Sequence, residues 1–381
     1  MRLPQQPEDL TPQWLTYALH LSGALPADTR IEASTWEEIG EERGFTGRVI
    51  RVRTRDSSAT GDDQPGHRQS LIAKLPLAPR IGTAEEQGEL SATDATRDAH
   101  ILRSARELHF YEELAPHCGV AVPRSLFAAM DLVDNRMVLL LEDLSGLRFG
   151  DVLTGCSVDD AALVVGSVAR LHGMWWGRGL PMPWLAGWTG DHDAAQVRLQ
   201  RNVARLPDHV ISTFPEDIQT LLEWLAGGAY TRILDGLSAA PRTLIHGDLH
   251  LDNIAFRDSS AAARPVITDW QTAGIGPAVV DLATCLSGTL DVADRGRTEA
   301  DLLAIYHDGL IEAGVSRYSR ADLERDYGLA LVRQLAGVFG WLANTELATL
   351  SGRERDVTLA AIGDGRLISA LRDNDPMSLL S

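Results

Sequence analysis

The feature that most constrains this chain is a polar run between short apolar segments. Residues 246–253 follow the pattern His-x-Asp-x-x-x-x-Asn; an apolar pair precedes them and the apolar triplet 254–256 follows. A second apolar run, 265–268, ends at Asp269. Both runs have the length and composition of strands, and we expect short strands that can pair. The pattern therefore predicts carboxylate and amide side chains gathered at the ends of short strands.

Phosphoryl transfer uses this set of side chains. One carboxylate orients the acceptor hydroxyl and accepts its proton, while a second carboxylate and an amide hold magnesium on the phosphates of a nucleotide. The spacing from His246 to Asn253 is that of the catalytic loop of protein kinases. By role, we predict that Asp248 is the catalytic base and that Asn253 and Asp269 are the metal ligands.

The two motifs also carry a family resemblance. His-Gly-Asp-Leu-His-Leu-Asp-Asn at 246–253 and Asp-Trp-Gln at 269–271 resemble the aminoglycoside phosphotransferase and choline kinase superfamily. Protein kinases usually have Arg where Gly247 stands, and their second motif ends Asp-Phe-Gly. The Asp-Trp-Gln ending resembles most the ecdysteroid-kinase-like branch, which includes many bacterial proteins of unassigned substrate. The resemblance covers most of the chain from a glycine-bearing turn near residue 44 to Asp281.

That turn lies between the strand-like segments 31–39 and 48–53. In kinase folds such a hairpin covers the nucleotide phosphates, because glycine lets backbone amides approach them closely. Gly44 and Gly47 are therefore expected to contact the nucleotide. The spacing G-x-x-x-G-x-x-G is not that of protein kinases, and an ordinary hairpin also uses glycine, so both interpretations stay open.

Lys74 lies within the next apolar strand-like segment, where it suits the phosphate-binding lysine of the third strand. The alternative is an edge-strand lysine that discourages aggregation. Such a phosphate-binding lysine needs a carboxylate partner, and we predict Glu107, on a helix over 96–115, with Glu112 and Glu113 as rivals.

A further strand pair, 125–130 and 136–141, precedes the segment 142–146. The resemblance implies that the chain crosses between lobes here and that its backbone recognises adenine. By resemblance alone, the Glu142 carbonyl and the Leu144 amide are the expected contacts.

The fold class implied is α+β, the two-lobed protein-kinase-like architecture. We expect residues 1–141 to form a nucleotide-binding lobe with an antiparallel sheet. Residues 142–381 should form a larger, mainly helical lobe that carries catalysis and substrate binding, with a mostly helical insertion over 178–240.

Several other residues invite a functional reading. His172 lies on an apolar helix and is expected to be a core histidine rather than a catalytic one. The Asp-His-Asp run at 191–193 is interpreted as a hydrated loop rather than a metal site. Asp281 falls in the first turn of a helix, and its family equivalent supports the catalytic loop by hydrogen bonding. Trp184 and Trp188 either line a substrate cleft or pack in the core.

Composition bounds the function. The 381 residues are 44% hydrophobic and carry a net charge of −18, which disfavours nucleic-acid binding, since phosphate contacts need a basic face. An acidic surface could instead attract a cationic substrate. The three cysteines show no disulfide or metal spacing, and neither a signal peptide nor a membrane-spanning run is visible. We therefore expect a cytoplasmic protein with no membrane partner.

Together these features predict an ATP-dependent, magnesium-requiring phosphotransferase that acts on a hydroxyl group of a small molecule. Antibiotic, sugar, amino alcohol and sterol-like alcohol all remain open as acceptors, and ATP rather than GTP is a family expectation. The alternative is a catalytically silent nucleotide-binding or scaffold protein. A protein kinase is disfavoured, because no Ala-Pro-Glu element follows Asp269.

Overall fold

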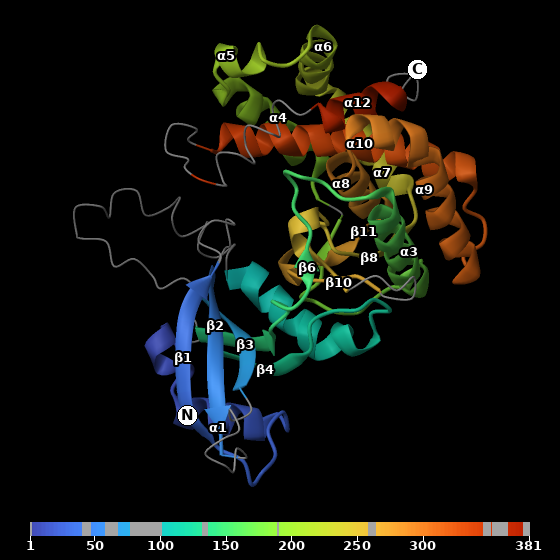
Figure 1. The fold of residues 1–381 in the computed structure, drawn as a ribbon. Helices are drawn as coiled ribbons and strands as arrows, with labels where there is room; N and C mark the ends of the chain where they lie inside the picture. Colours follow the sequence, from blue (N-terminus) through green and yellow to red (C-terminus); the bar gives the residue numbers. More distant parts are fainter. Residues whose placement is uncertain are drawn as a thin grey trace, which may run out of the picture. The chain divides into compact units, whose positions relative to one another are not determined.

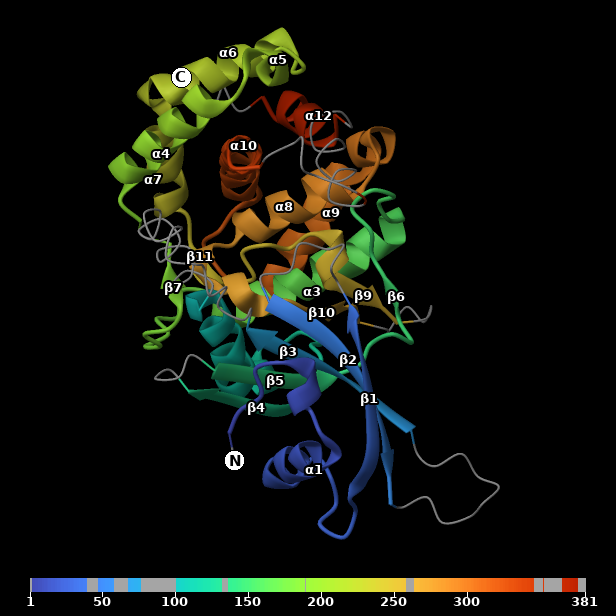
Figure 2. The same cartoon turned by 90° about the vertical axis from the view of Figure 1, so that its left-hand side faces the viewer.

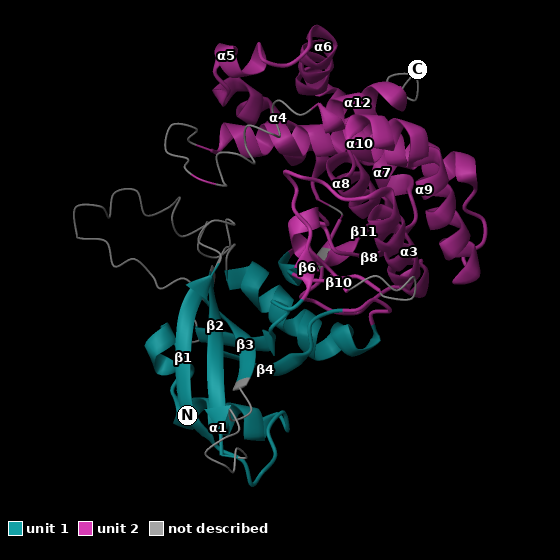
Figure 3. Cartoon of the chain, viewed as in Figure 1, with its two compact units in different colours: residues 1–117, 122–146, 269–271 teal, residues 118–121, 147–268, 272–381 magenta. Residues whose placement is uncertain are grey.

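The computed structural model describes residues 2–39, 47–57, 68–76, 101–131, 136–188, 190–257, 264–345, 352 and 365–375. The chain divides into two compact units (Figure 3). Unit 1 comprises residues 1–117, 122–146 and 269–271, and unit 2 comprises residues 118–121, 147–268 and 272–381. The Asp-Trp-Gln segment therefore belongs to unit 1, whereas the polar run 246–253 belongs to unit 2.

Unit 1 is built on a five-stranded sheet of order β1-β2-β3-β5-β4 (Figure 1). Its strands are β1 (Ile31–Ile39), β2 (Gly47–Asp56), β3 (Arg68–Pro76), β4 (Ser125–Asp131) and β5 (Arg136–Glu142). All neighbouring strands are antiparallel. The five strands predicted for this region are thus confirmed, and β3 lies in the middle of the sheet.

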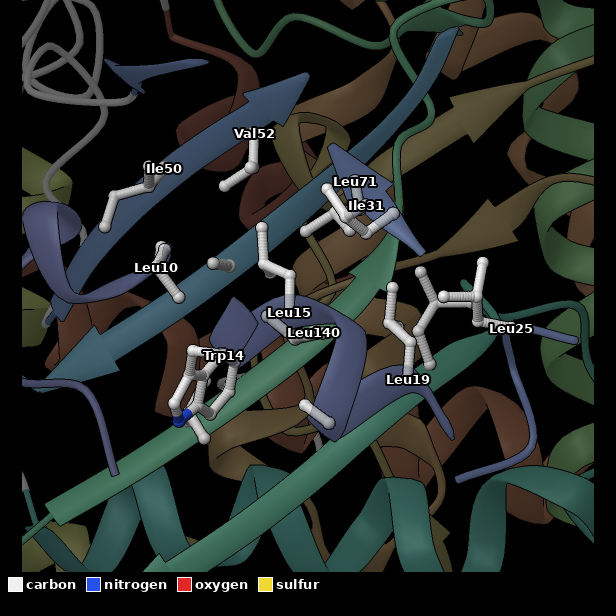
Figure 4. Close-up of a cluster of buried hydrophobic side chains, with 14 of the residues drawn as sticks. Leu10, Trp14, Leu15, Leu19, Leu25, Ile31, Ile50, Val52, Leu71 and Leu140 are labelled. Carbon is white, nitrogen blue, oxygen red and sulfur yellow. The ribbon is translucent and has the colours of Figure 1, made fainter. Parts of the chain in front are cut away.

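One face of this sheet is covered by α1 (Pro12–Leu21) (Figure 4). Thr11 caps the helix by accepting a hydrogen bond from the Trp14 amide, and Pro12 occupies the first turn, where no backbone donor is required. The buried side of the helix meets inward-facing residues of the sheet. The cluster includes Trp14, Leu15, Leu19, Ile50, Val52, Leu71 and Leu140.

A helix over residues 101–109 continues into a π-helical turn, η4 (Phe110–Leu114), and then into a short 3₁₀ turn, η5 (Ala115–His117). Phe110, Tyr111 and Leu114 are buried. The predicted helix is confirmed over its described part, and residues 96–100 lie outside the described residues.

Unit 2 is mainly helical. Its helices are α3 (Val158–Trp175), α4 (His192–Arg205), α5 (Asp208–Ile211), α6 (Glu216–Trp224), η6 (Leu225–Ala229), α7 (Tyr230–Ala239), α8 (Val279–Thr289), α9 (Val292–Glu312), α10 (Arg320–Ala343) and α12 (Arg366–Asp373). Helix α3 packs on α9, and α10 contacts α8, α4 and α7 (Figure 2). The predicted helical insertion corresponds to α4 through α7. No helix among the described residues is both long and apolar enough to cross a bilayer.

Two small sheets complete unit 2. In one, β8 (Arg242–Ile245) pairs with β11 (Gly274–Pro277), which pairs with β7 (Ala186–Gly187). In the other, β9 (Ile254–Phe256) lies between β10 (Val266–Ile267) and β6 (Arg148–Phe149). The strands that flank residues 246–253 therefore belong to different sheets, because the 3₁₀ turn η7 (Leu251–Asn253) redirects the chain. The expected strand pairing is found between β9 and β10.

Candidate active site

The loop that follows β8 is shaped by a glycine. Gly247 has φ +86°, and a Cβ at this position would lie 2.6 Å from the carbonyl oxygen of Thr272, so a larger residue would force the backbone to move. The neighbouring His246 ring links the loop to the residue that follows β10. Its Nε2 lies 2.9 Å from the Thr268 carbonyl, and its Nδ1 accepts a hydrogen bond from the Asp248 amide at 3.3 Å. The glycine and the histidine together fix the backbone that presents Asp248.

A buried carboxylate, that of Asp281, also holds this backbone through hydrogen bonds. Asp281, in the first turn of α8, accepts hydrogen bonds from the amides of His246 at 2.6 Å and Gly247 at 2.8 Å. His172 Nε2 lies 3.2 Å from Asp281, and its Nδ1 lies 2.8 Å from the Tyr306 hydroxyl. Burial alone would raise the pKa of Asp281, but the hydrogen bond and charge of His172 and further donors bring it below its usual range. The predicted core role of His172 and supporting role of Asp281 are confirmed.

The Asp248 side chain itself is 47% exposed, as a group that must meet a substrate would be. His250 Nε2 lies 3.6 Å from the Asp248 carboxylate, and the Asn253 amide nitrogen donates to the Asp248 carbonyl at 3.0 Å. No described residue donates to Asn253 Oδ1, although Asn253 is only 4% exposed. The loop therefore fixes the Asn253 nitrogen and leaves its amide oxygen for another ligand. Sequence reasoning did not single out His250, which lies inside the motif.

Unit 1 contains a second polar cluster, around Lys74. Its Nζ lies 2.6 Å from Glu107 Oε1 and 3.4 Å from Asp269 Oδ1, while Gln271 Nε2 donates to the other Asp269 oxygen at 3.2 Å. Because β3 has partners on both sides, the edge-strand interpretation of Lys74 is wrong. The structure thus brings Lys74 together with the predicted partner Glu107 and with Asp269.

Lys74 is also the only lysine in the chain; the other basic side chains among its 35 Lys and Arg residues are arginines. A chain that uses arginine everywhere else keeps lysine where a compact point charge is required and a planar fork would not fit. This compositional signal was available in the sequence and would have distinguished Lys74 without any structural template.

The charges of this cluster do not balance. Burial lowers the pKa of Lys74, but the charges of Asp269 and Glu107 outweigh it and raise this pKa above its usual range, so the ammonium stays charged. Burial raises the pKa of Glu107, and the neighbouring Asp269 charge adds to this effect. One ammonium facing two carboxylates leaves an excess of negative charge. A divalent cation at Asp269 would compensate it, so the donor set fits magnesium.

Aromatic stacking holds the Asp-Trp-Gln segment in place. The Trp270 ring is fully buried and stacks on Phe110 with a centroid distance of 3.9 Å and an interplanar angle of 7°. The Trp270 backbone also forms a hydrogen bond with Glu107, and Arg106 Nη1 donates to the Gln271 carbonyl at 3.0 Å. The helix that carries Glu107 therefore also anchors the residue that follows Asp269. Asp269 has φ +62°, a left-handed conformation that aspartate tolerates better than most residues.

The rivals of Glu107 lie elsewhere. Glu113 is 3.0 Å from His109 Nδ1 on the surface of unit 1, and Glu112 lies 4.0 Å from the same ring nitrogen. Neither contacts Lys74 in the described structure.

The remaining predicted nucleotide contacts are placed only in part. Gly44 lies outside the described residues, and Gly47 is the first residue of β2. Glu142 ends β5, and Leu144 is buried. The segment between them is fixed by the Asp143 carboxylate, which accepts hydrogen bonds from side chains of β2 and β3 and from the backbone that follows.

The run 191–193 was expected to be a hydrated loop, and this prediction is wrong, because these residues form the start of helix α4. Asp191 caps α4 by accepting a hydrogen bond from the Ala194 amide at 3.0 Å, and His192 Nδ1 lies 2.7 Å from Asp235. The capping preference of aspartate at such a position explains the difference. Within the described ranges, no group of three or more His, Cys, Asp or Glu residues could hold a metal ion.

Comparison with known families matches residues 80–321 to the Phosphotransferase enzyme family (APH). The chain belongs to this family. Among solved structures, the GDP complex of aminoglycoside 2'-phosphotransferase-IIIa is similar to this family member with a TM-score of 0.52 and 13% identity, over 92% of this chain and 98% of that one. This likeness confirms the predicted kinase-like α+β fold.

Two further structures are similar at TM-scores of 0.49. Macrolide 2'-phosphotransferase MphH from Brachybacterium faecium is 18% identical, over 91% of this chain and 97% of that one. The amicoumacin kinase hAmiN, in complex with AMP-PNP, Ca²⁺ and Ami, is 13% identical, over 92% of each chain. A search of curated proteins found no match. Membership of the phosphotransferase family is thus established, while the ecdysteroid-kinase-like branch is not confirmed.

Proposed function

We propose that this phosphotransferase-family protein transfers the terminal phosphoryl group of ATP to a hydroxyl group of a small molecule. The observation that carries the proposal is the loop 246–253: its backbone is clamped by Asp281, yet the carboxylate of Asp248 is half exposed. A rigid backbone that presents one accessible carboxylate is what the alignment of an acceptor hydroxyl requires.

Asp248 acts as the catalytic base in this proposal. The phosphoryl group passes through a loose transition state, so the carboxylate contributes mainly by orienting the hydroxyl and by accepting its proton late. His250, 3.6 Å away, lies close enough to influence where that carboxylate points. The proton leaves the acceptor oxygen as the new bond to phosphorus forms.

Asn253 and Asp269 are the proposed magnesium ligands, through the amide oxygen and a carboxylate oxygen. Magnesium commonly takes one or two protein ligands and completes its coordination with water and nucleotide phosphates. When bound, it neutralises charge on the phosphates. Lys74, oriented by Glu107 at 2.6 Å, contributes a fixed positive charge to the same phosphates.

We further propose that the N-terminal lobe, residues 1–141, holds the nucleotide. Gly44 and Gly47 then lie near the nucleotide phosphates, and the backbone of Glu142 and Leu144 recognises the adenine ring. Related structures were solved with GDP and with AMP-PNP, which supports nucleotide binding without deciding between ATP and GTP. We favour ATP, and a cytoplasmic location. No observation favours the catalytically silent alternative.

The lone lysine provides the test of this proposal. An acyl-phosphate derivative of ATP transfers its acyl group to a lysine amine beside bound phosphates, and Lys74 is the only lysine side chain available. We expect a single acylated lysine peptide, found by mass spectrometry, whose formation is suppressed by excess ATP and magnesium. The Lys74→Arg variant keeps the charge and should take no side-chain label. Labelling that ATP leaves unchanged would contradict the proposal.

Turnover is tested separately, by incubating the protein with ATP, magnesium and a panel of hydroxylated compounds and measuring an added phosphate by mass. The panel should include antibiotics, sugars, amino alcohols and sterol-like alcohols. Transfer to one class identifies the acceptor type.

A further inference from the structure

Arg333, on α10, is a partly buried cation for which the described part of the chain provides no acidic partner. No described residue forms a hydrogen bond or an ion pair with its guanidinium group, whose Cζ lies 4.8 Å from the centre of the Trp188 ring. Other arginines of the same helix are paired: Arg320 lies 2.8 Å from Glu324, and Arg325 lies 2.8 Å from Asp326. The chain contains 53 acidic residues, so a shortage of carboxylates does not explain why no described one pairs with Arg333.

Trp188 is held by β11, the strand that pairs with β8 just before the catalytic loop. Its amide donates to the Ile275 carbonyl in β11 at 2.9 Å. A Cβ at Gly276 would lie 3.2 Å from the Trp188 ring and 2.6 Å from the Ile245 side chain, so the ring packs against β11, which pairs with the strand β8 that leads into the loop. The Trp188 indole nitrogen is buried and meets no hydrogen-bond acceptor among the described residues. Trp188 therefore offers an aromatic face beside β11 and an indole N–H for which no described residue provides an acceptor.

Arg333 also interacts electrostatically with the catalytic loop and with the carboxylate that holds it. Burial lowers the pKa of Arg333, and the charges of Tyr230, Asp281 and Asp248 oppose that effect. Tyr230, the first residue of α7, is influenced by Arg333 and by Arg198 of α4, although burial dominates and raises the Tyr230 pKa. Two cations and a tyrosine hydroxyl, contributed by α4, α7 and α10, thus interact electrostatically with one another, and Arg333 also interacts with Asp248.

Removing a guanidinium from water without an anionic partner costs free energy, and this cost is recovered when a bound anion forms charge-assisted hydrogen bonds with it. The planar fork of arginine suits a carboxylate or phosphate in particular. Stacking on an indole ring keeps the fork oriented before a ligand arrives. Arg333 has the surroundings of an anion-recognition residue rather than of a structural ion pair.

We propose that the acceptor alcohol carries an anionic group, a carboxylate or a phosphate monoester, which pairs with Arg333 while the hydroxyl of the acceptor faces Asp248. The inference rests on the proposed kinase activity and narrows its substrate class. It differs from the alternative raised by the net charge, in which an acidic surface attracts a cationic substrate. The acidic surface as a whole repels such an acceptor, so selectivity comes from the local site.

The test is phosphate transfer from isotope-labelled ATP to matched acceptors. Each anionic alcohol is paired with a neutral relative: gluconate with gluconamide, glucuronate with glucuronamide, and glucose 6-phosphate with glucose. Kanamycin and choline serve as cationic acceptors. We expect the wild-type protein to phosphorylate at least one anionic member and to act on its neutral relative with a KM raised by about ten- to a hundredfold, the effect of losing one charge-assisted interaction.

Three variants locate the effect. Arg333→Gln should raise the KM for the anionic acceptor by a similar factor, while the KM for ATP and the turnover of the neutral relative stay unchanged. Arg333→Lys should restore part of the affinity, because it keeps the charge but loses the fork. Arg201→Gln removes an exposed arginine of α4 for which no described residue provides a partner, and should behave as wild type.

The outcomes separate this inference from the proposed function. Preferred transfer to glucose, kanamycin or choline would support a small-molecule kinase and overturn the anionic substrate. Equal behaviour of Arg333→Gln and Arg201→Gln toward the anionic acceptor would also overturn it. A fall in kcat for every acceptor would assign Arg333 to the transferred phosphoryl group instead. Transfer to no acceptor at all would contradict the proposed function and, with it, this inference.

Discussion

Replacing Asp281 with Asn tests how the catalytic loop is held. The carboxylate receives N–H groups from His246, Gly247 and His172, at 2.6, 2.8 and 3.2 Å, and is fully buried. Asparagine has the same shape but only one oxygen, so its NH₂ group must face at least one buried N–H donor. Leaving a buried donor unsatisfied costs about 1–3 kcal/mol, and losing a charged acceptor adds a comparable amount. We expect a loss of about 3 kcal/mol.

For a unit of this size, 1 kcal/mol corresponds to about 2–4 °C, so the transition of unit 2 should fall by about 6–12 °C. Thermal unfolding measures this shift, and amide hydrogen exchange in the peptide 244–256 shows where stability is lost. Asp217→Asn makes the same chemical change at an exposed pair with Arg372, and should cost less than about 1 kcal/mol. If both variants lost the same small amount, or if exchange in the loop were unchanged, Asp281 would not be the clamp described.

Three further predictions concern Asp281, Phe110 and Lys74. Folding lowers the pKa of Asp281, so the stability that its carboxylate contributes is complete above the pKa in the unfolded chain, about 3.9. This stability is lost as the pH falls through the pKa in the folded protein. Thermal melts at decreasing pH should show that loss in the wild type and not in Asp281→Asn. Phe110→Ala should destabilise unit 1 by about 3–5 kcal/mol in urea, whereas Phe110→Leu should lose mainly the stack on Trp270, about 1 kcal/mol. Lys74→Met should weaken ATP binding by about ten- to a hundredfold in calorimetry, and a change below twofold would remove Lys74 from the phosphate site.

Much of the fold and of the candidate site could be predicted from the sequence, because local patterns and a known motif spacing specify them. Apolar segments bounded by polar, glycine-bearing turns mark the strands of unit 1, and the His-x-Asp-x-x-x-x-Asn spacing marks the loop. Glu107 could be matched to Lys74 because the kinase template requires a lysine–glutamate pair and the helix around Glu107 resembles that of the family. That pairing is present at 2.6 Å.

Other features depend on contacts between distant segments, which a single sequence does not encode visibly. The stack of Phe110 on Trp270 joins a helix to a segment far along the chain, and neither aromatic residue differs in sequence from ordinary core. The position of Arg333 over Trp188 is of the same kind. Asp191 is a different case, because a capping aspartate is a local signal, but weighing a metal site against a hydrated loop leaves out a helix start.

In the proposed mechanism, Asp248 aligns the acceptor hydroxyl while other residues hold the nucleotide. The most direct measurement is the rate of phosphate transfer by Asp248→Asn and wild type, with the dissociation constant for ATP and magnesium determined on the same samples. We expect a fall in rate of at least about a hundredfold with unchanged nucleotide affinity. Transfer by Asp248→Asn at the wild-type rate would contradict it.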